Sequence, residues 1–277
     1  MVIRSALYVP GDQPGKLAKA LDRGSDSLIV DLEDAVLPAH KAEARAAVAG
    51  WLRGLGPGGP EIYVRVNPGE AGHEDLRAVA LPGVRGVCVA KTESAAELDA
   101  VDAVLTAAEA AEGLPGGSIA VCPLLESAGA VLSAPEIARA PRVLRLQIGE
   151  ADLRAELGVE TGPDERELLW ARSQVVLASA AARLVPPLAP VSTDFRDLDA
   201  LRASTVALRR LGFRGRACIH PAQLAVVNEV FTPTGEELAQ ARDLIARFEA
   251  AGTGVVTDAR GRMVDEAVVR AARRLLS

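Results

Sequence analysis

The stretch "LIVDLEDAV", residues 28–36, joins a run of apolar residues directly to three acidic ones. Its apolar part, residues 28–30, is typical of a buried β-strand, and Asp31, Glu33 and Asp34 follow at once. Buried charge is unfavourable unless a partner neutralises it. The stretch therefore predicts a strand that ends at a polar pocket rather than in the packed core.

Short apolar runs of this kind recur along the chain and alternate with longer amphipathic patterns. The predicted strands cover residues 5–10, 27–33, 61–67, 86–91, 118–126, 143–149, 189–194 and 216–220. Strands that alternate with helices predict a parallel sheet with right-handed crossovers, and eight such units predict a (β/α)8 TIM barrel. An open, doubly wound sheet is the competing arrangement. Its Gly-x-Gly-x-x-Gly turn is absent after the first strand, where only Gly11 and Gly15 occur.

Amphipathic segments between the strands predict helices, and a different pattern follows the last strand. The helical segments cover residues 14–24, 38–55, 94–111, 165–184 and 197–212. Ser94 and Glu97 form the pattern of a capping box, and Gly212 is a stop signal. A helix at about residues 234–251, a hairpin that turns near 260–261 and a terminal helix complete the chain. We therefore expect a barrel over residues 1–231 and a C-terminal helical and hairpin extension over 232–277.

The composition argues against several function classes. The chain of 277 residues carries a net charge of −6 without a basic run, so we expect no nucleic-acid partner. No apolar run approaches the roughly 18 residues of a membrane span, and the N-terminus lacks the pattern of a signal peptide. We therefore expect a cytoplasmic protein that does not insert into membranes. Cys88, Cys122 and Cys218 lie in apolar runs without metal-type spacing and are expected to be buried thiols.

Nearly every predicted strand ends in a polar or charged residue, and in a barrel these ends converge on the active-site face. Carboxylates arrive from several strands without a cluster of Cys or His, which suits Mg²⁺. Glu126 in "PLLESAGA" and Asp152 in "GEADL" are the best ligand pair. Glu33 and Asp34 would hold metal-bound water or orient basic groups. Arg65 in "YVRVN" offers a bidentate fork for a substrate carboxylate, and a salt bridge to Glu33 or Asp34 is the structural alternative.

Other polar residues have plainer interpretations. Lys91 could form a Schiff base, but neighbouring acids raise rather than lower the pKa of a lysine, so an ion pair or ligand contact is favoured. His220 in "CIHPAQL" is expected to hold a turn through a hydrogen bond rather than to transfer protons. Lys16, Lys19 and Arg23 are candidates for contacts to the phosphates of a cofactor, and a solvated helix face is the simpler interpretation.

With these strand ends identified, the chain resembles the citrate lyase β-subunit-like (CitE-like) branch of the HpcH/HpaI aldolase family. The matching segments, in chain order, are "LYVPGDQPGKLAKAL", "IVDLEDAV" followed by "KAEAR", "VRVN", "AKTES", "LLESAGA", "GEADL", "CIHPAQ" and "GRMVD". The resemblance implies a homotrimer of barrels that uses Mg²⁺ to make or break a carbon–carbon bond. The implied substrates are β-hydroxyacyl-CoA thioesters of the malyl, citramalyl or citryl type. These would give an acyl-CoA and a small α-keto acid, namely oxaloacetate, pyruvate or glyoxylate.

The resemblance also implies roles for individual residues. Glu126 and Asp152 would bind Mg²⁺, and Arg65, with Glu126 beside it, would bind the α-keto acid. The last segment would pack on a neighbouring subunit and cover its site, where Asp265 would act as acid and base. The residues expected to take part in catalysis are thus Asp265, Arg65, Glu33 and Asp34. In the synthetic direction Asp265 would remove a proton from the acyl thioester, and the resulting enolate would attack the keto acid.

One departure from the family pattern concerns the second metal ligand. Relatives carry Gly-Ala-Glu-Asp-Leu where this chain has "GEADL" at 149–153, so that on an extended strand end Glu150 would turn to the opposite face. Three alternatives stay open: a citrate lyase β subunit that acts on an acyl-carrier protein in a complex, a metal aldolase for free acids, and an inactive barrel that serves as a binding subunit. The presence of Glu126, Asp152 and Arg65 disfavours the inactive barrel.

Overall fold

The computed structural model describes residues 3–252, 254–258 and 260–276. The chain divides into two compact units, Met1–Phe231 and Thr232–Ser277. The first unit contains a seven-stranded parallel sheet, and the second contains a two-stranded antiparallel hairpin.

The sheet of the first unit closes into a ring. Its strands are β1 (Ser5–Pro10), β2 (Ser27–Asp31), β3 (Glu61–Val66), β4 (Val84–Val89), β5 (Ala120–Leu125), β6 (Gln147–Ile148) and β7 (Arg216–Cys218). They pair in the order β6-β5-β4-β3-β2-β1-β7. Isolated bridges join Leu188 to Gln147 of β6 and Ala189 to Arg216 of β7. The chain thus forms the expected TIM-like barrel.

The strand expected at 189–194 is the weakest part of this ring, because only the bridges at Leu188 and Ala189 remain of it. This segment contains Pro190 and follows closely on Pro186 and Pro187, and proline cannot donate the backbone N–H that a strand ladder requires. The seventh predicted strand, at 189–194, is therefore in the right place in the barrel, but its regular structure was overestimated.

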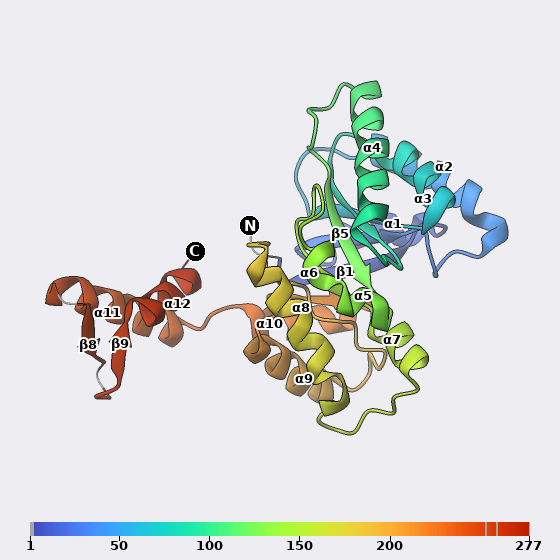
Figure 1. Cartoon of the computed structure of the whole chain (residues 1–277). Coiled ribbons are helices and arrows are strands. Elements are labelled where there is room, and N and C mark those ends of the chain that lie inside the picture. The colour runs from blue at the N-terminus through green and yellow to red at the C-terminus, as the bar shows by residue number, and fades with distance from the viewer. Residues whose placement is uncertain (1–2, 253, 259, 277) are drawn as a thin grey trace. The chain divides into compact units, whose positions relative to one another are not determined.

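Helices cover the outside of the barrel (Figure 1). They are α1 (Pro14–Ala20), α2 (Lys41–Arg53), α3 (Gly69–Val79), α4 (Ala95–Ala111), α5 (Ala128–Leu132), α6 (Ala134–Ile137), α7 (Glu150–Leu157), α8 (Leu169–Ala181), α9 (Leu198–Leu211) and α10 (Leu224–Phe231). Short 3-10 turns lie at Pro38–His40, Arg166–Leu168 and Pro221–Gln223. Helix α3 was not predicted, because its first half, "GEAGHED", lacks an apolar stripe. None of the helices in the described part of the chain is long and apolar enough to span a membrane.

Half of the capping box predicted for α4 is present. The Ser94 hydroxyl accepts the Glu97 N–H, whereas the Glu97 carboxylate accepts the N–H of Glu93 rather than that of Ser94.

The apolar side chains form two separate cores. The larger core lies between the sheet and the helices and includes Leu28, Val30, Leu76, Leu98 and Leu105. The smaller one fills the barrel and includes Ile29, Tyr63, Cys88, Cys122 and Leu188. Because side chains alternate along a strand, the inward position of Ile29 also turns Asp31 inward. The three cysteines are buried free thiols, as expected.

The second unit is built from α11 (Gly235–Ala251), the hairpin strands β8 (Val255–Thr257) and β9 (Met263–Asp265), and α12 (Glu266–Leu276). These elements match the predicted order of helix, hairpin and helix (Figure 1). Thr234 and Glu237 cap α11 reciprocally. Val264 of the hairpin and Val269 of α12 are buried in this unit.

Candidate active site

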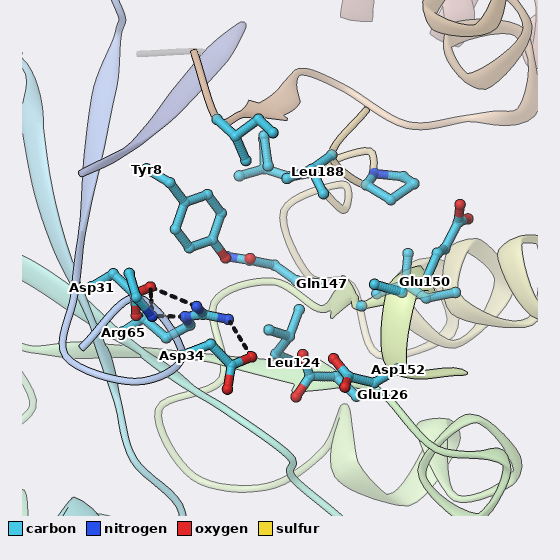
Figure 2. A pocket seen from close by; sticks show the side chains of 18 of the residues that line it. Tyr8, Asp31, Asp34, Arg65, Leu124, Glu126, Gln147, Glu150, Asp152 and Leu188 are labelled. Atoms are coloured by element: carbon cyan, nitrogen blue, oxygen red, sulfur yellow. Dashed lines mark hydrogen bonds and ion pairs between the residues drawn. The ribbon is translucent and has the colours of Figure 1, made fainter. Parts of the chain in front are cut away.

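The carboxyl ends of the barrel strands surround a cavity of about 430 Å³. Asp31, Arg65, Glu126 and Asp152 all line it. Figure 2 shows Asp31 and Arg65 on one side of this cavity and Glu126 and Asp152 on the other. Four of the residues that the sequence singled out, from different strands and one helix, are therefore brought together.

Asp31 and Arg65 form a bidentate ion pair at the ends of β2 and β3. The Arg65 Nε and Nη2 atoms donate to the two Asp31 oxygens at 2.7 and 2.6 Å. Asp31 also accepts the N–H groups of Glu33 and Ala35, at 2.9 and 3.1 Å, although it is only 3% exposed. The guanidinium carbon lies 5.1 Å from the centre of the Tyr8 ring. The buried acid is thus fully partnered, and the arginine is held from two sides.

Glu33, Asp34 and Lys91 extend this ionic network. Arg65 Nη1 lies 3.1 Å from Glu33, which confirms the salt bridge that the sequence allowed. Lys91 Nζ donates to Glu33 and also to Asp34, the latter at 3.3 Å. The hydrogen bond to Glu33 raises the pKa of Lys91, so the amine stays charged and is unsuited to Schiff-base formation. The ion pair favoured for Lys91 is therefore confirmed, and Glu33 and Asp34 contact basic groups.

The main chain of Lys91 orients Glu126. Lys91 has a φ of 50°, in the left-handed region that residues other than glycine rarely occupy. In this conformation its N–H donates to Glu126 Oε2 at 2.8 Å. Burial raises the pKa of Glu126 to about 7, and the nearby Asp152 carboxylate contributes to the rise. One strained residue therefore holds the Glu126 carboxylate with its backbone and the Glu33 carboxylate with its side chain.

The turn between β6 and α7 brings Asp152 to Glu126. Asp152 lies in the first turn of α7, and Figure 2 shows its carboxylate beside that of Glu126. The turn passes so close to Glu126 that a Cβ atom at Gly149 would lie 2.5 Å from Glu126 Cγ and Oε1. Only glycine fits at this position without displacing Glu126.

The pair Glu126 and Asp152 fits a Mg²⁺ ion. No lysine or arginine side chain forms a salt bridge with either carboxylate in the described structure, and burial, the main cause of the raised pKa of Glu126, makes an unpaired negative charge there unfavourable until a cation binds. The described residues contain no group of three or more Asp, Glu, His or Cys side chains that could hold a metal ion by themselves. An ion with two protein carboxylates that completes its shell with water and substrate oxygens matches this donor set, and Mg²⁺ is such an ion.

Glu150 lies at the start of α7 rather than on an extended strand end, and this corrects the geometry assumed from the sequence. Its two oxygens accept Arg172 Nε and Nη2 at 2.5 and 2.7 Å. Figure 2 shows its carboxylate turned away from Glu126 and Asp152. Glu150 therefore joins α7 to α8 instead of facing the metal pair.

The remaining predicted residues lie elsewhere. His220 Nδ1 accepts the Ala222 N–H at 3.1 Å, and its ring stacks on Phe195 with 4.5 Å between centroids, which confirms its turn-holding role. Lys16, Lys19 and Arg23 are exposed. Asp265 belongs to the second unit, where its Oδ1 accepts the Val268 N–H at 3.1 Å and caps α12.

Three residues that line or shape the cavity were not identified from the sequence: Tyr8, Gln147 and Gly149. Tyr8 and Gln147 lie inside predicted strands, and their places on the inward face of the barrel could have been found from the alternation with their neighbours. Gly149 gave a weaker signal, because its role depends on the side chain of Glu126 from another strand.

Comparisons with known proteins support this description. Residues 4–221 match the family described as HpcH/HpaI aldolase/citrate lyase. The chain is 34% identical to the citrate lyase subunit beta of Leuconostoc mesenteroides subsp. cremoris, covering 99% of this chain and 92% of that protein. It is 35% identical to a (3S)-malyl-CoA thioesterase of Cereibacter sphaeroides, covering 99% of this chain and 93% of the other. The crystal structure of CitE from Mycobacterium tuberculosis with magnesium, acetoacetate and coenzyme A is similar at a TM-score of 0.80 and 30% identity, covering 99% of this chain and 97% of that chain.

Proposed function

Because the chain belongs to the HpcH/HpaI aldolase/citrate lyase family, we propose that it is a Mg²⁺-dependent carbon–carbon lyase of β-hydroxyacyl-CoA thioesters. It cleaves a malyl-, citramalyl- or citryl-type thioester into an acyl-CoA and a small α-keto acid, or joins the two in the reverse direction. The observation that carries this proposal is the meeting of Glu126, Asp152 and Arg65 in one cavity. The magnesium and coenzyme A in the related CitE structure support it.

Glu126 and Asp152 would hold the metal, and Arg65 would hold the keto acid. When bound, Mg²⁺ supplies a Lewis acid that polarises the carbonyl of the keto acid. Arg65 has five N–H donors. Two of them donate to Asp31, and Nη1 forms ion pairs with Glu33 at 3.1 Å and Asp34 at 3.9 Å, so donors remain for the substrate carboxylate. Asp31 fixes the plane of the guanidinium before the substrate arrives, which favours a single bound orientation of the keto acid.

Asp265 would move the proton. In cleavage, the Asp265 carboxylate accepts the proton that the β-hydroxyl group loses as the carbon–carbon bond breaks, and the resulting carboxylic acid gives this proton to the α-carbon of the thioester enolate. In synthesis, Asp265 removes that proton first. We propose that the segment Thr232–Ser277 brings Asp265 to the site of a neighbouring subunit in a homotrimer, as the resemblance to CitE-like proteins implies.

An activity panel tests the proposal. Purified protein with Mg²⁺ is given glyoxylate, pyruvate or oxaloacetate with acetyl- or propionyl-CoA, and the corresponding lyase reactions are run as well. Turnover that is lost with EDTA and in Asp152→Ala supports the lyase. Release of CoA from a malyl-type thioester without net formation of a keto acid and an acyl-CoA would instead indicate a thioesterase, the activity named for one relative.

A second candidate is a citrate lyase β subunit that acts on an acyl-carrier protein. The similarity to the citrate lyase subunit beta of Leuconostoc favours it. If none of the CoA thioesters in the activity panel is turned over, but Mg²⁺-dependent binding of a keto acid is intact, this candidate is supported. If the protein binds no keto acid in the presence of Mg²⁺, neither lyase activity is supported, and the barrel is then a non-catalytic binding subunit.

A further inference from the structure

The charges around the cavity restrict which α-keto acid can bind there. The acidic residues that line it are Asp31, Asp34, Glu126, Asp152 and Glu150, and only the Glu150 carboxylate is turned away, where it pairs with Arg172. Arg65 is the only basic side chain that lines the cavity in the described part of the chain, and Asp31 already binds it through both oxygens. A bound Mg²⁺ would offset two of these negative charges and leave the lining acidic.

One carboxylate of a substrate can be accommodated in this setting. It can accept either the remaining donors of Arg65 or the N–H groups in the first turn of α7, which have no intrahelical partners. Glu150, Ala151 and Asp152, which begin α7, line the cavity, whereas the N–H of Gly149 before them already donates to the Leu125 carbonyl at 2.9 Å. Arg65 and this turn lie on the two sides of the cavity described above (Figure 2).

A second carboxylate would find no cation. Much of the remaining wall is aliphatic and is formed by Leu124, Leu188, Ala189, Pro190, Ala217 and Ile219. Leu124 on β5 is the register partner of Gln147 on β6 and precedes the ligand Glu126 by two positions, so it faces the same side of the strand. Tyr8 and Gln147 add neutral polar groups, which can orient a carboxylate but do not neutralise it.

We infer that the site takes a 2-oxo acid with one carboxylate and a small apolar substituent, such as pyruvate, in preference to a dicarboxylate such as oxaloacetate. The inference rests on the proposed function and narrows it to citramalyl-type rather than citryl-type thioesters. An unpaired carboxylate against an acidic and aliphatic wall should weaken binding at least about tenfold. Burying the methyl group of pyruvate should favour it over glyoxylate by about fourfold.

Calorimetric binding of four acids to the full-length protein with saturating Mg²⁺ tests the inference. The acids are glyoxylate, pyruvate, 2-oxobutyrate and freshly dissolved oxaloacetate, and 2-oxobutyrate serves as an analogue of oxaloacetate without the second charge. Tight binding of pyruvate and 2-oxobutyrate, with oxaloacetate at least about tenfold weaker, is the expected result. Oxaloacetate binding as tightly as pyruvate overturns the inference but leaves the proposed lyase intact. Absence of Mg²⁺-dependent binding for all four acids overturns the proposed function itself.

A variant separates charge from shape. Ile219 lines the cavity and is 41% exposed, so replacing it does not remove a packed core residue. Ile219→Arg should raise the affinity for oxaloacetate relative to pyruvate by about tenfold, whereas the control Ile219→Gln should leave the ratio near that of the wild type. If the folded Ile219→Arg protein keeps the wild-type ratio of oxaloacetate to pyruvate affinity, the lack of a second cation in the cavity does not cause the preference for pyruvate. The inference is then refuted.

Discussion

Replacing Gly149 with alanine should damage the metal site through a contact of a single atom. The new Cβ would lie 2.5 Å from Glu126 Cγ, whereas ordinary contacts begin at 3.4 Å, so the Glu126 side chain must move by about 1 Å. The backbone itself has a φ of −100° and accepts alanine. A misplacement of about 1 Å lowers catalysis by about 100-fold, so kcat/KM should fall by that factor and Mg²⁺ affinity should fall with it. Overpacking of this kind should lower the free energy of unfolding by only about 1–3 kcal/mol.

The assay combines Mg²⁺ titration of keto-acid binding, kcat/KM for the pair active in the panel, and thermal unfolding. Gly50→Ala is the matched control, because Gly50 lies in α2 with nothing within 4 Å of its added Cβ. This control should keep wild-type activity and gain up to about 1 kcal/mol of helix stability. Wild-type Mg²⁺ affinity and kcat/KM in folded Gly149→Ala would refute the view that this close contact positions Glu126 as a metal ligand.

Four other perturbations test the same site. Burial raises the pKa of Glu126 to about 7, so Mg²⁺ must displace a proton from this carboxyl at lower pH. The affinity for Mg²⁺ should therefore fall about tenfold per pH unit below that value. Constant affinity in titrations from about pH 5 to about pH 8 would contradict the role of Glu126 as a metal ligand. The raised pKa also means that the free energy of unfolding of the metal-free protein falls by up to about 3 kcal/mol as pH rises from about 4.5 to about 7. Glu126→Gln should remove this pH dependence in denaturant titrations. Arg65→Lys keeps the charge but loses the bidentate contact to Asp31, so the affinity for the keto acid should fall about 100-fold. The control Arg53→Lys, at the exposed ion pair with Glu112, should leave this affinity unchanged. Equal keto-acid affinities of Arg65→Lys and the wild type would show that the bidentate contact is dispensable. Mixing Asp152→Ala and Asp265→Ala subunits by joint refolding should restore activity at about a quarter of the sites of a trimer, and no recovery would place Asp265 in its own subunit's site or outside catalysis.

The candidate site could be predicted largely because its signals are local in the sequence. Arg65, Glu126 and the acids after residue 30 each follow an apolar run directly, and barrel topology brings strand ends together. Asp152 was paired with Glu126 from the pattern of strand ends, although it lies in the first turn of a helix rather than on a strand. These placements depend on which residue follows which strand, and that information is contained in the chain order.

The features that escaped prediction depend on contacts between distant segments or on backbone conformation. The pairing of Glu150 with Arg172 links α7 to α8, so its direction could not be read from the residues next to it. The left-handed φ of Lys91 has no marker in "VAKTES", because lysine is not a residue that usually adopts it. The strand at 189–194 was overestimated because its apolar residues outweighed Pro190 in the pattern, although proline limits pairing in the barrel.

Asp31 shows how the site restricts the evolution of the chain. Its two oxygens accept two bonds from Arg65 and the N–H groups of Glu33 and Ala35, so one side chain shapes both the loop and the arginine. A change at position 31 alone removes the bidentate partner of the guanidinium and leaves it only Glu33 and the more distant Asp34, and a change at position 65 alone leaves a buried carboxylate without its cation. In a library selected for turnover, we therefore expect the two positions to covary, and adaptation to a new keto acid to proceed through the aliphatic wall instead.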